Sequence, residues 1–227
     1  MLAAGVLADA TDPWIRWDWV FRHIPVIGGA LVQHVQLTAI AVGIGLLISL
    51  PLGFWAWRIP LARGPILSLT GILYTIPSLA LFAILVPFTG LSTLTAEIGL
   101  VSYTLLILIR NVVVGLDGVP AEVREAATGM GYRPLARLIR IDFPLAVPAI
   151  IAGIRIATVT TIGLVTVTAL IGLGGLGELI LQGLINDFKS PLLVGAVLSV
   201  ALAVVADLSL SGLQRLATPW SRGEGRA

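Results

Sequence analysis

The longest polar stretch of this chain runs from residue 119 to residue 144 and separates two long apolar segments. Its first half carries two glutamates beside a pair of alanines, and its second half carries three arginines. Small alanine side chains let another surface approach closely, and the charged side chains keep the stretch in water. We therefore expect these residues to bind another protein rather than to catalyse a covalent reaction.

The rest of the sequence excludes several kinds of active site. It contains no G-x-x-x-x-G-K-[ST] segment, so the chain cannot hold ATP phosphates in a P-loop. With no cysteine and only His23 and His34, it offers no His/Cys metal cluster. The net charge of +2 is small and the arginines are scattered, which argues against nucleic acid as a partner. We expect no catalytic residue, metal or cofactor in this chain.

The spacing of prolines and glycines predicts two short helices in the polar stretch. Pro120 can open the first helix, because a missing N–H costs nothing in the first turn. Gly129 and Gly131 end that helix, the usual C-terminal role of glycine. Pro134 then starts a second helix, which we expect Pro144 to close.

The elements that carry this stretch are predicted to cross a membrane. The chain is 57% hydrophobic and 11% charged, whereas a soluble domain carries roughly 25% charged residues. Only helices and closed barrels can satisfy every backbone polar group in lipid, and runs of this length favour helices. A shorter, glycine-rich stretch, 172–185, is predicted to be a partial or re-entrant helix, so five or six crossings are possible. The five predicted spans are 31–57, 65–87, 94–116, 145–171 and 192–213.

The positions of the arginines predict the orientation of the chain. If the stretch 119–144 is cytoplasmic, five spans leave the N-terminus outside and the C-terminus inside. This arrangement agrees with the positive-inside tendency. The inside segments then hold Arg58, Arg63, Arg124, Arg133, Arg137, Arg140, Arg215, Arg222 and Arg226, and the outside segments hold only Arg16, Arg22 and Lys189.

The polar stretch resembles the EAA loop of ABC importer permeases. That pattern is E-A-A, three residues, G, nine residues, I-x-L-P, and the chain matches it with Glu125, Ala126, Ala127, Gly131 and residues 141–144. Phe143 replaces the usual leucine, a departure that keeps an apolar side chain. In that family the loop forms the coupling helix that docks on a cytoplasmic ATPase. The resemblance implies this docking role for Glu125, Ala126, Ala127, Gly131, Tyr132 and Arg133.

Two further segments resemble the osmoprotectant permeases, which import glycine betaine, carnitine, choline or proline betaine. Residues 75–80 read T-I-P-S-L-A as in that group, with Tyr74 where glutamine is usual. Residues 169–180 resemble its glycine-rich A-F-I-G-A-G-G-L-G-D-L-I segment, although methionine and phosphonate permeases have similar stretches. The resemblance, which covers roughly residues 30 to 215, implies an all-α, type I ABC importer permease in the bacterial plasma membrane.

The same resemblance implies the partners and a domain plan. We expect two cytoplasmic ATPase subunits that bind ATP and Mg, a second copy of the permease or a related permease, and an extracytoplasmic substrate-binding protein. A methionine permease, an ion-driven secondary transporter and a membrane scaffold are the alternatives. The single domain, 1–227, would divide into an interfacial segment (1–30, rich in tryptophan), three spans (31–118), the coupling loop (119–144), the last spans (145–215) and a cytoplasmic tail (216–227).

Several polar and aromatic residues inside the spans are candidates for the transport pathway or its gate. Arg155 either lines the pathway or packs at a subunit interface, because an intramembrane arginine faces protein or water. Asp207, inside the fifth span, fits a cap or a buried pair across helices better than a transport role, and Glu97 begins the third span near the outer face. Arg110 and Asn111 fit either a brace for the loop or a helix end. His34, expected to open the first span, fits a satisfied polar group, and Tyr74, Phe82, Phe88 and Tyr103 could offer cation–π faces. The pathway candidates are Tyr74, Pro77, Ser78, Arg155, Gly174 and Gly175.

Overall fold

The computed structural model describes residues 13–219, and these residues are all-α, as the sequence predicts, with no strand among them. The predicted tail 216–227 therefore lies mostly outside the described residues, as do residues 1–12. A π-helical turn (Leu138–Asp142) and a 3-10 turn (Thr168–Ile171) flank one long helix. In chain order the helices are α1 (Trp17–Arg22), α2 (Ile24–Arg58), α3 (Pro60–Thr75), α4 (Ser78–Thr89), α5 (Thr93–Asp117), α6 (Ala121–Gly129), α7 (Pro134–Arg137), α8 (Phe143–Val167), α9 (Leu176–Ile185) and α10 (Lys189–Ala217).

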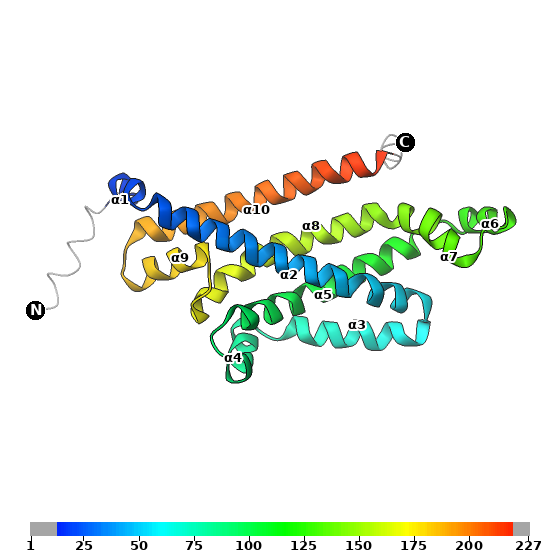
Figure 1. The fold of residues 1–227 in the computed structure, drawn as a ribbon, viewed down its shortest axis with the longest axis horizontal. Coiled ribbons are helices and arrows are strands. Elements are labelled where there is room, and N and C mark those ends of the chain that lie inside the picture. Colours follow the sequence, from blue (N-terminus) through cyan, green and yellow to red (C-terminus); the bar gives the residue numbers. More distant parts are fainter. Residues whose placement is uncertain (1–12, 220–227) are drawn as a thin grey trace, which may run out of the picture.

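The helices form an elongated bundle whose two ends differ (Figure 1). Helices α2, α5 and α8 pack together along its length, α3 lies against α2 and α5, and α10 lies against α8 and α9. Helices α6 and α7 project from one end, where the C-terminal end of α10 also lies (Figure 1). Helices α1 and α9 lie at the opposite end. The described chain thus begins at one end of the bundle and finishes at the other.

Four helical segments are long and apolar enough to cross a membrane. They are α2, α5, the continuous segment Pro134–Ile171 that contains α8, and α10. The bent pair α3 and α4 makes a fifth if it counts as one crossing. The ten-residue α9 is apolar but short, as predicted for the glycine-rich stretch. The chain is therefore a multi-pass membrane protein.

The predicted second span is wrong in one respect, because it is broken. Helices α3 and α4 meet at an angle of 95° instead of forming one helix over 65–87. Pro77 disfavours a helical conformation at the residue before it, and Ile76 accordingly has extended backbone angles (φ −65°, ψ 127°). The Tyr103 hydroxyl of α5 donates a hydrogen bond to the Ile76 carbonyl, which the break leaves free.

The first crossing begins earlier than predicted. Helix α2 starts at Ile24 rather than residue 31 and continues for 35 residues to Arg58, so part of the predicted interfacial segment is helix. Pro25 fits there because it occupies the first turn, where no intrahelical donor is needed. At about 1.5 Å per residue, this helix is roughly 52 Å long, well beyond a hydrocarbon core of about 30 Å.

Glycines allow the three central helices to approach closely. A Cβ on Gly45 of α2 would lie 1.9 Å from Thr104 Oγ1 of α5, so no larger residue fits. A Cβ on Gly153 of α8 would lie 2.5 Å from the Asn111 Cβ of α5. Close approach of this kind increases dispersion contacts, on which helix association in membranes depends.

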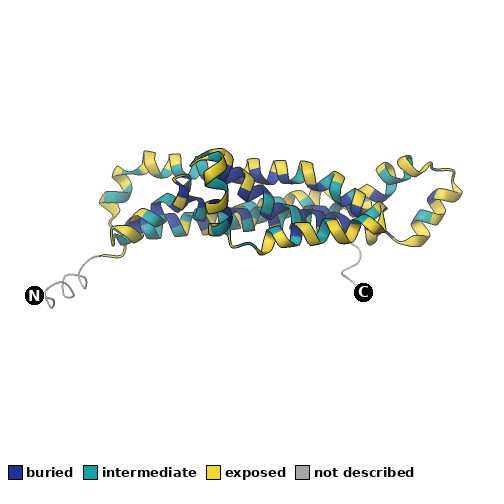
Figure 2. Cartoon of the chain, turned by 90° about the horizontal axis from the view of Figure 1, so that it is seen from below, coloured by how far each residue is buried: buried dark blue, intermediate teal, exposed yellow. Residues whose placement is uncertain are grey.

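Burial inside the chain is uneven (Figure 2). Half of the most hydropathic window of α5 is buried (50%), whereas only 11% of that of α10 is. The outward face of α10 is apolar and uncovered by this chain, with Val197, Val204 and Leu208 all more than half exposed. This face is therefore left for lipid or for another subunit.

Candidate functional site

The loop between α5 and α8 begins with the short helix α6. Pro120 immediately precedes it and Glu122 lies in its first turn, where a carboxylate complements the helix dipole. Glu125 and Ala126 are exposed, whereas Ala127 is fully buried. The EAA triplet thus presents two residues outward and packs the third inside the loop.

A glycine turn ends α6 in the manner predicted. Gly131 has a left-handed conformation (φ 83°), which side-chain-bearing residues adopt only with strain. The Gly131 N–H donates to the Thr128 carbonyl at 3.0 Å, and the Tyr132 N–H donates to the Ala127 carbonyl at 3.1 Å. These two bonds are those of a Schellman motif, which satisfies the last carbonyls of a helix. The glycine at this position therefore fixes the direction in which the chain leaves α6.

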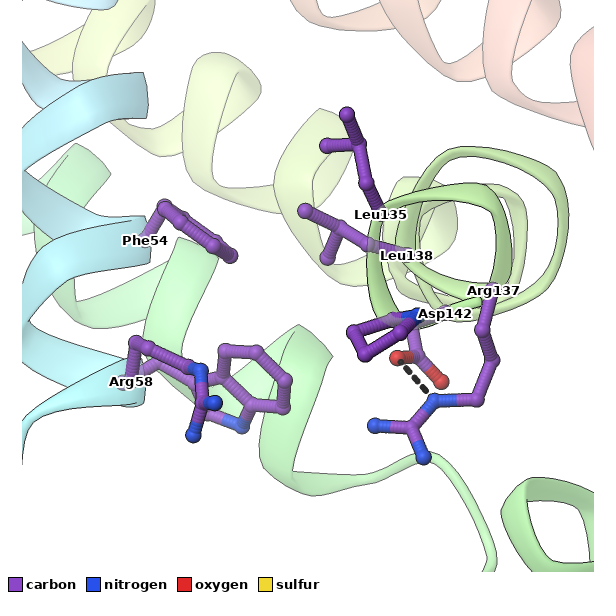
Figure 3. Close-up of a pocket in the computed structure, with 8 residues that line it drawn as sticks. Phe54, Arg58, Leu135, Arg137, Leu138 and Asp142 are labelled. Carbon is purple, nitrogen blue, oxygen red and sulfur yellow. Dashed lines mark hydrogen bonds and ion pairs between the residues drawn. The ribbon is translucent and has the colours of Figure 1, made fainter. Parts of the chain in front are cut away.

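Asp142 is the electrostatic centre of the loop. Its carboxylate is completely buried and accepts hydrogen bonds from Arg124 Nε at 3.4 Å and Arg137 Nε at 3.3 Å (Figure 3 shows the second). Two guanidinium groups around one carboxylate offset the desolvation of the buried charge. The contact joins α6, α7 and the start of α8. The sequence pattern assigned no role to Asp142, which occupies the variable position x of I-x-L-P.

The two arginines extend this network into the membrane-spanning helices. Arg124 also donates to the Leu116 carbonyl near the end of α5, and its guanidinium lies 5.3 Å from the centre of the Trp57 ring of α2. Arg137 Nη1 donates to Thr128 Oγ1 of α6 at 3.3 Å. The loop is thus bound to α2 and α5 as well as to its own helices, so it is attached firmly to the bundle.

Pro144 does not close the second helix, contrary to the prediction. The chain continues from α7 through the π-helical turn directly into α8, and Pro144 lies in the first turn of α8. A proline cannot donate to the carbonyl four residues earlier, and a wider π turn before it accommodates the missing bond. Helix α7 and α8 therefore form one continuous helical segment, Pro134–Ile171.

A cleft of about 430 Å³ separates the end of α2 from α7 (Figure 3). Its walls combine apolar side chains with Arg58 and Arg137, while Arg133 and Arg140 are exposed nearby along the chain. Such a surface fits a partner that offers an apolar side chain with acidic neighbours. The lining residues are Phe54, Trp57, Arg58, Pro134, Leu135, Arg137, Leu138 and Asp142.

The six residues predicted to dock on an ATPase all lie at this end of the bundle. Glu125, Ala126, Gly131 and Arg133 are exposed, and Tyr132 is half-buried. Ala127 is the exception, because its burial makes it a packing residue of the loop.

The predicted pathway residues lie in three separate places. Tyr74, Pro77 and Ser78 flank the break between α3 and α4. Gly174 and Gly175 lie between the 3-10 turn and α9, against Ala169 and His34, and Arg155 lies in the middle of α8. The structure does not bring them together within one chain.

His34 holds the glycine-rich turn before α9. It lies within α2 and is fully buried, so its predicted place at the start of the helix is wrong. Its Nδ1 accepts from the Leu176 N–H at 3.3 Å, so the proton resides on Nε2, which lies 3.0 Å from the Ile162 carbonyl. A Cβ on Gly175 would lie 2.8 Å from the His34 Cβ, so only glycine fits. His34 is therefore a satisfied polar group, as predicted.

The aromatic residues proposed as cation–π faces do not form one cage in the described chain. Tyr74 and Tyr103 pack edge to face with ring centres 5.8 Å apart. On α4, Phe82 is buried in the core whereas Phe88 is 83% exposed, so they face different surroundings. Glu97 of α5 is buried, and neither of its carboxyl oxygens has a hydrogen-bond partner among the described residues.

A second arginine–aspartate centre joins α8 to α10. Arg155 Nε and Nη2 each lie 2.9 Å from one oxygen of Asp207, a bidentate pair. Arg155 Nη1 also donates to Gln214 Oε1 at 3.3 Å, and Gln214 Nε2 donates to the Pro148 carbonyl at 3.2 Å. The predicted pairing of Asp207 is confirmed, with Arg155 as its partner.

Comparisons with known proteins agree with this geometry. Residues 41–218 match the family described as binding-protein-dependent transport system inner membrane component. The chain is similar to the osmoprotectant import permease protein OsmW of Salmonella typhimurium, with 38% identity over 82% of this chain and 89% of OsmW. It is also similar to the choline transport system permease protein OpuBB of Bacillus subtilis, with 36% identity over 88% of this chain and 94% of OpuBB.

A solved structure shares the arrangement of helices. A chain of the MetNI methionine ABC transporter in an inward-facing conformation superimposes with a TM-score of 0.76 over 87% of this chain and 98% of that one. The sequences are 20% identical, so the likeness concerns the fold. It confirms the predicted type I ABC importer permease fold.

Proposed function

Because this chain belongs to the family of binding-protein-dependent transport system inner membrane components, we propose that it forms the membrane pathway of an osmoprotectant importer. The solutes are compatible solutes such as glycine betaine, carnitine, choline or proline betaine. OsmW and OpuBB, named as osmoprotectant and choline permeases, support this substrate class. A permease for another small solute such as methionine is the second candidate, favoured only by the fold of MetNI.

The observation that carries the proposal is the loop at the end of the bundle. Helix α6, the Gly131 turn and α7 form a rigid projection held by Asp142, and Glu125 and Ala126 lie on its surface. This projection docks on a cytoplasmic ATPase subunit, which binds and hydrolyses ATP with Mg. The chain itself catalyses no covalent step.

The loop end of the bundle is the cytoplasmic end. The N-terminus is then outside and the C-terminus inside, which is supported by the position of α1 and the end of α10 at opposite ends of the bundle (Figure 1). The exposed arginines around the loop follow the positive-inside tendency.

Transport follows from alternating access in an assembly of two permeases and two ATPases. The second permease is a further copy of this chain or a related one, and an extracytoplasmic binding protein delivers the solute. ATP binding closes the ATPases, the docked loops move with them, and the permeases open outward. Hydrolysis returns the assembly to the inward-facing state as rigid-body rocking.

The docking step is tested with two charge reversals on one helix. Glu125→Arg is expected to reduce co-purification of the ATPase at least tenfold and to abolish ATP-driven uptake. Glu122→Arg, an exposed residue of the same helix outside the predicted docking set, is the matched control and should retain both. Equal ATPase recovery and uptake with Glu125→Arg would overturn the docking role.

The substrate class is tested by uptake of labelled glycine betaine, choline and methionine into cells that carry the complete transporter. We expect accumulation of an osmoprotectant that persists when ionophores dissipate ion gradients but ceases when ATP is depleted. Uptake of methionine alone would support the second candidate. Ionophore-sensitive uptake would instead support a secondary transporter.

A further inference from the structure

The pair formed by Arg155 and Asp207 lies deep within the membrane-spanning part of the chain. Arg155 is the central residue of α8, twelve positions from each end of the helix at Phe143 and Val167. At about 1.5 Å per residue it lies roughly 18 Å from either end of that helix. Charged side chains at this depth face protein or water rather than lipid. The surface of α8 and α10 that carries the pair therefore faces the interior of the assembled transporter.

The pair is accessible from that surface. The side chains of Arg155 and Asp207 are 29% and 37% exposed, and both line a groove of about 450 Å³. This volume falls in the range of about 300–1,000 Å³ that is usual for small-molecule sites. The remaining walls are apolar apart from one hydroxyl, and consist of Ile156, Val159, Thr160, Ala203, Val204 and Leu208.

We propose that Arg155 and Asp207 form a binding site for a zwitterionic solute, with its carboxylate on Arg155 and its cationic group beside Asp207. The proposal rests on the importer function proposed above and adds a site of contact within the membrane. The planar guanidinium matches a carboxylate with two parallel hydrogen bonds, the geometry that Asp207 now occupies.

Exchange of partners keeps every charge in the groove compensated. In the unloaded site Arg155 and Asp207 neutralise one another, and in the loaded site each is neutralised by one end of the solute. Gln214 remains bonded to Arg155 Nη1 and to the Pro148 carbonyl, so it can hold the guanidinium in place while Asp207 separates from it. The apolar walls then contact the methyl groups of a quaternary ammonium.

This arrangement predicts discrimination between solutes with and without a carboxylate. Glycine betaine and carnitine can neutralise both residues. Choline offers a cation but no carboxylate, so it would separate Asp207 from Arg155 and leave the guanidinium without a counter-charge. Leaving one member of such a pair uncompensated is unfavourable. The site therefore favours zwitterions over simple cations.

The test compares uptake of glycine betaine and choline by the complete transporter reconstituted in proteoliposomes. Its ATPase subunits face the inside of the vesicles, and its binding protein is added outside. Arg155→Gln is expected to reduce the rate of glycine betaine uptake at least tenfold and to raise the ratio of choline to glycine betaine uptake. Arg155→Lys keeps the positive charge but cannot form two parallel hydrogen bonds with a carboxylate, so we expect an intermediate reduction of glycine betaine uptake. Arg63→Gln removes a matched pair, Arg63 Nη1 to Asp117 Oδ2 at 2.9 Å, outside the groove, and should leave the ratio unchanged.

A purely structural pair makes a different prediction. In Arg155→Met with Asp207→Leu, apolar side chains replace the pair, a change that often preserves or increases stability. Our proposal expects an assembled complex with binding-protein-stimulated ATP hydrolysis but at least tenfold slower glycine betaine uptake. Normal uptake by this double variant, or an equal fall for both solutes in Arg155→Gln, overturns the site. If the unaltered transporter carries neither solute, the proposed function itself fails.

Discussion

The two arginine–aspartate centres of this chain use the same side chains in different surroundings. At the end of the bundle, the Asp142 side chain is completely buried between Arg124 and Arg137, which both bond to its carboxylate. In the middle of the bundle, Asp207 has one arginine partner and both side chains open to a groove. An enclosed carboxylate with two partners fixes a structure, whereas an open pair with one partner can exchange it. The comparison separates the rigid part of the importer from the part that can meet its cargo.

The largest effect is expected at the enclosed centre. Asp142→Ala leaves two guanidiniums without their shared counter-charge, and breaking a buried pair typically costs about 3–5 kcal/mol. We expect a clear fall in the thermal midpoint of the purified protein and loss of ATPase co-purification. Asp117→Asn, at a half-exposed pair near the same end, is the control. A midpoint as high as that of the control would show that the loop does not depend on Asp142.

A third carboxyl group tests what burial does without any partner. Glu97 is 8% exposed, and neither of its carboxyl oxygens bonds to a residue within 13–219. Leaving a buried polar group unsatisfied costs about 1–3 kcal/mol, so Glu97→Leu should raise the thermal midpoint. Ser102→Leu, at a partly exposed position of α5, is the control, with little expected change. A lower midpoint for Glu97→Leu would mean that the carboxyl has a stabilising partner in the assembled transporter.

The glycine turn sets the geometry of the rigid region with a smaller energy. Gly131→Ala places a Cβ in a left-handed residue, which costs about 1–2 kcal/mol, and no neighbouring atom within 4 Å adds a clash. We expect weaker ATPase binding measured by titration. Gly131→Asn is the informative control, because asparagine tolerates this conformation better. Identical binding by the alanine and asparagine variants would show that backbone conformation is not the cause.

The smallest effect on stability is expected at the open centre. Asp207→Asn leaves Arg155 without its counter-charge, but both side chains are partly exposed to the groove, so the thermal midpoint should fall less than in Asp142→Ala, where the carboxylate is fully buried. Uptake, by contrast, should fall strongly if the groove binds solute. Measuring both quantities on one preparation sharpens the comparison. A large fall in the thermal midpoint of Asp207→Asn would show that this pair, like the enclosed centre, stabilises the fold.

Much of the architecture follows from local sequence. Long apolar runs predict the crossings, and the left-handed turn at Gly131 follows from glycine spacing. The break between α3 and α4 is not predicted, although Pro77 is among the candidate residues, because the hydropathy of an apolar run does not show whether its helix is straight or bent. The early start of α2 differs from the prediction because residues 24–30 were assigned to the interfacial segment, although Pro25 fits the first helical turn.

The candidate sites depend on contacts between distant segments, which a single sequence shows less well. Asp142 meets Arg124 across 18 positions and Arg155 meets Asp207 across 52. The second pair was partly foreseeable, because charges inside a membrane need a counter-charge. The partners of His34, Ile162 and Leu176, lie more than 120 positions away, so the sequence does not show which groups this histidine contacts.

The continuous helical segment from Pro134 to Ile171 has a mechanical consequence. Because the helical turns continue from α7 through the π turn into α8, the loop end and the middle of the bundle belong to one helical segment. Arg155 lies roughly 30 Å along this segment from Pro134, at about 1.5 Å per residue. A tilt imposed at the loop end therefore swings Arg155 relative to α10 directly, with no relay of intervening contacts. The tilt of this one segment would then couple ATP hydrolysis by the ATPase docked on the loop to solute binding beside Arg155.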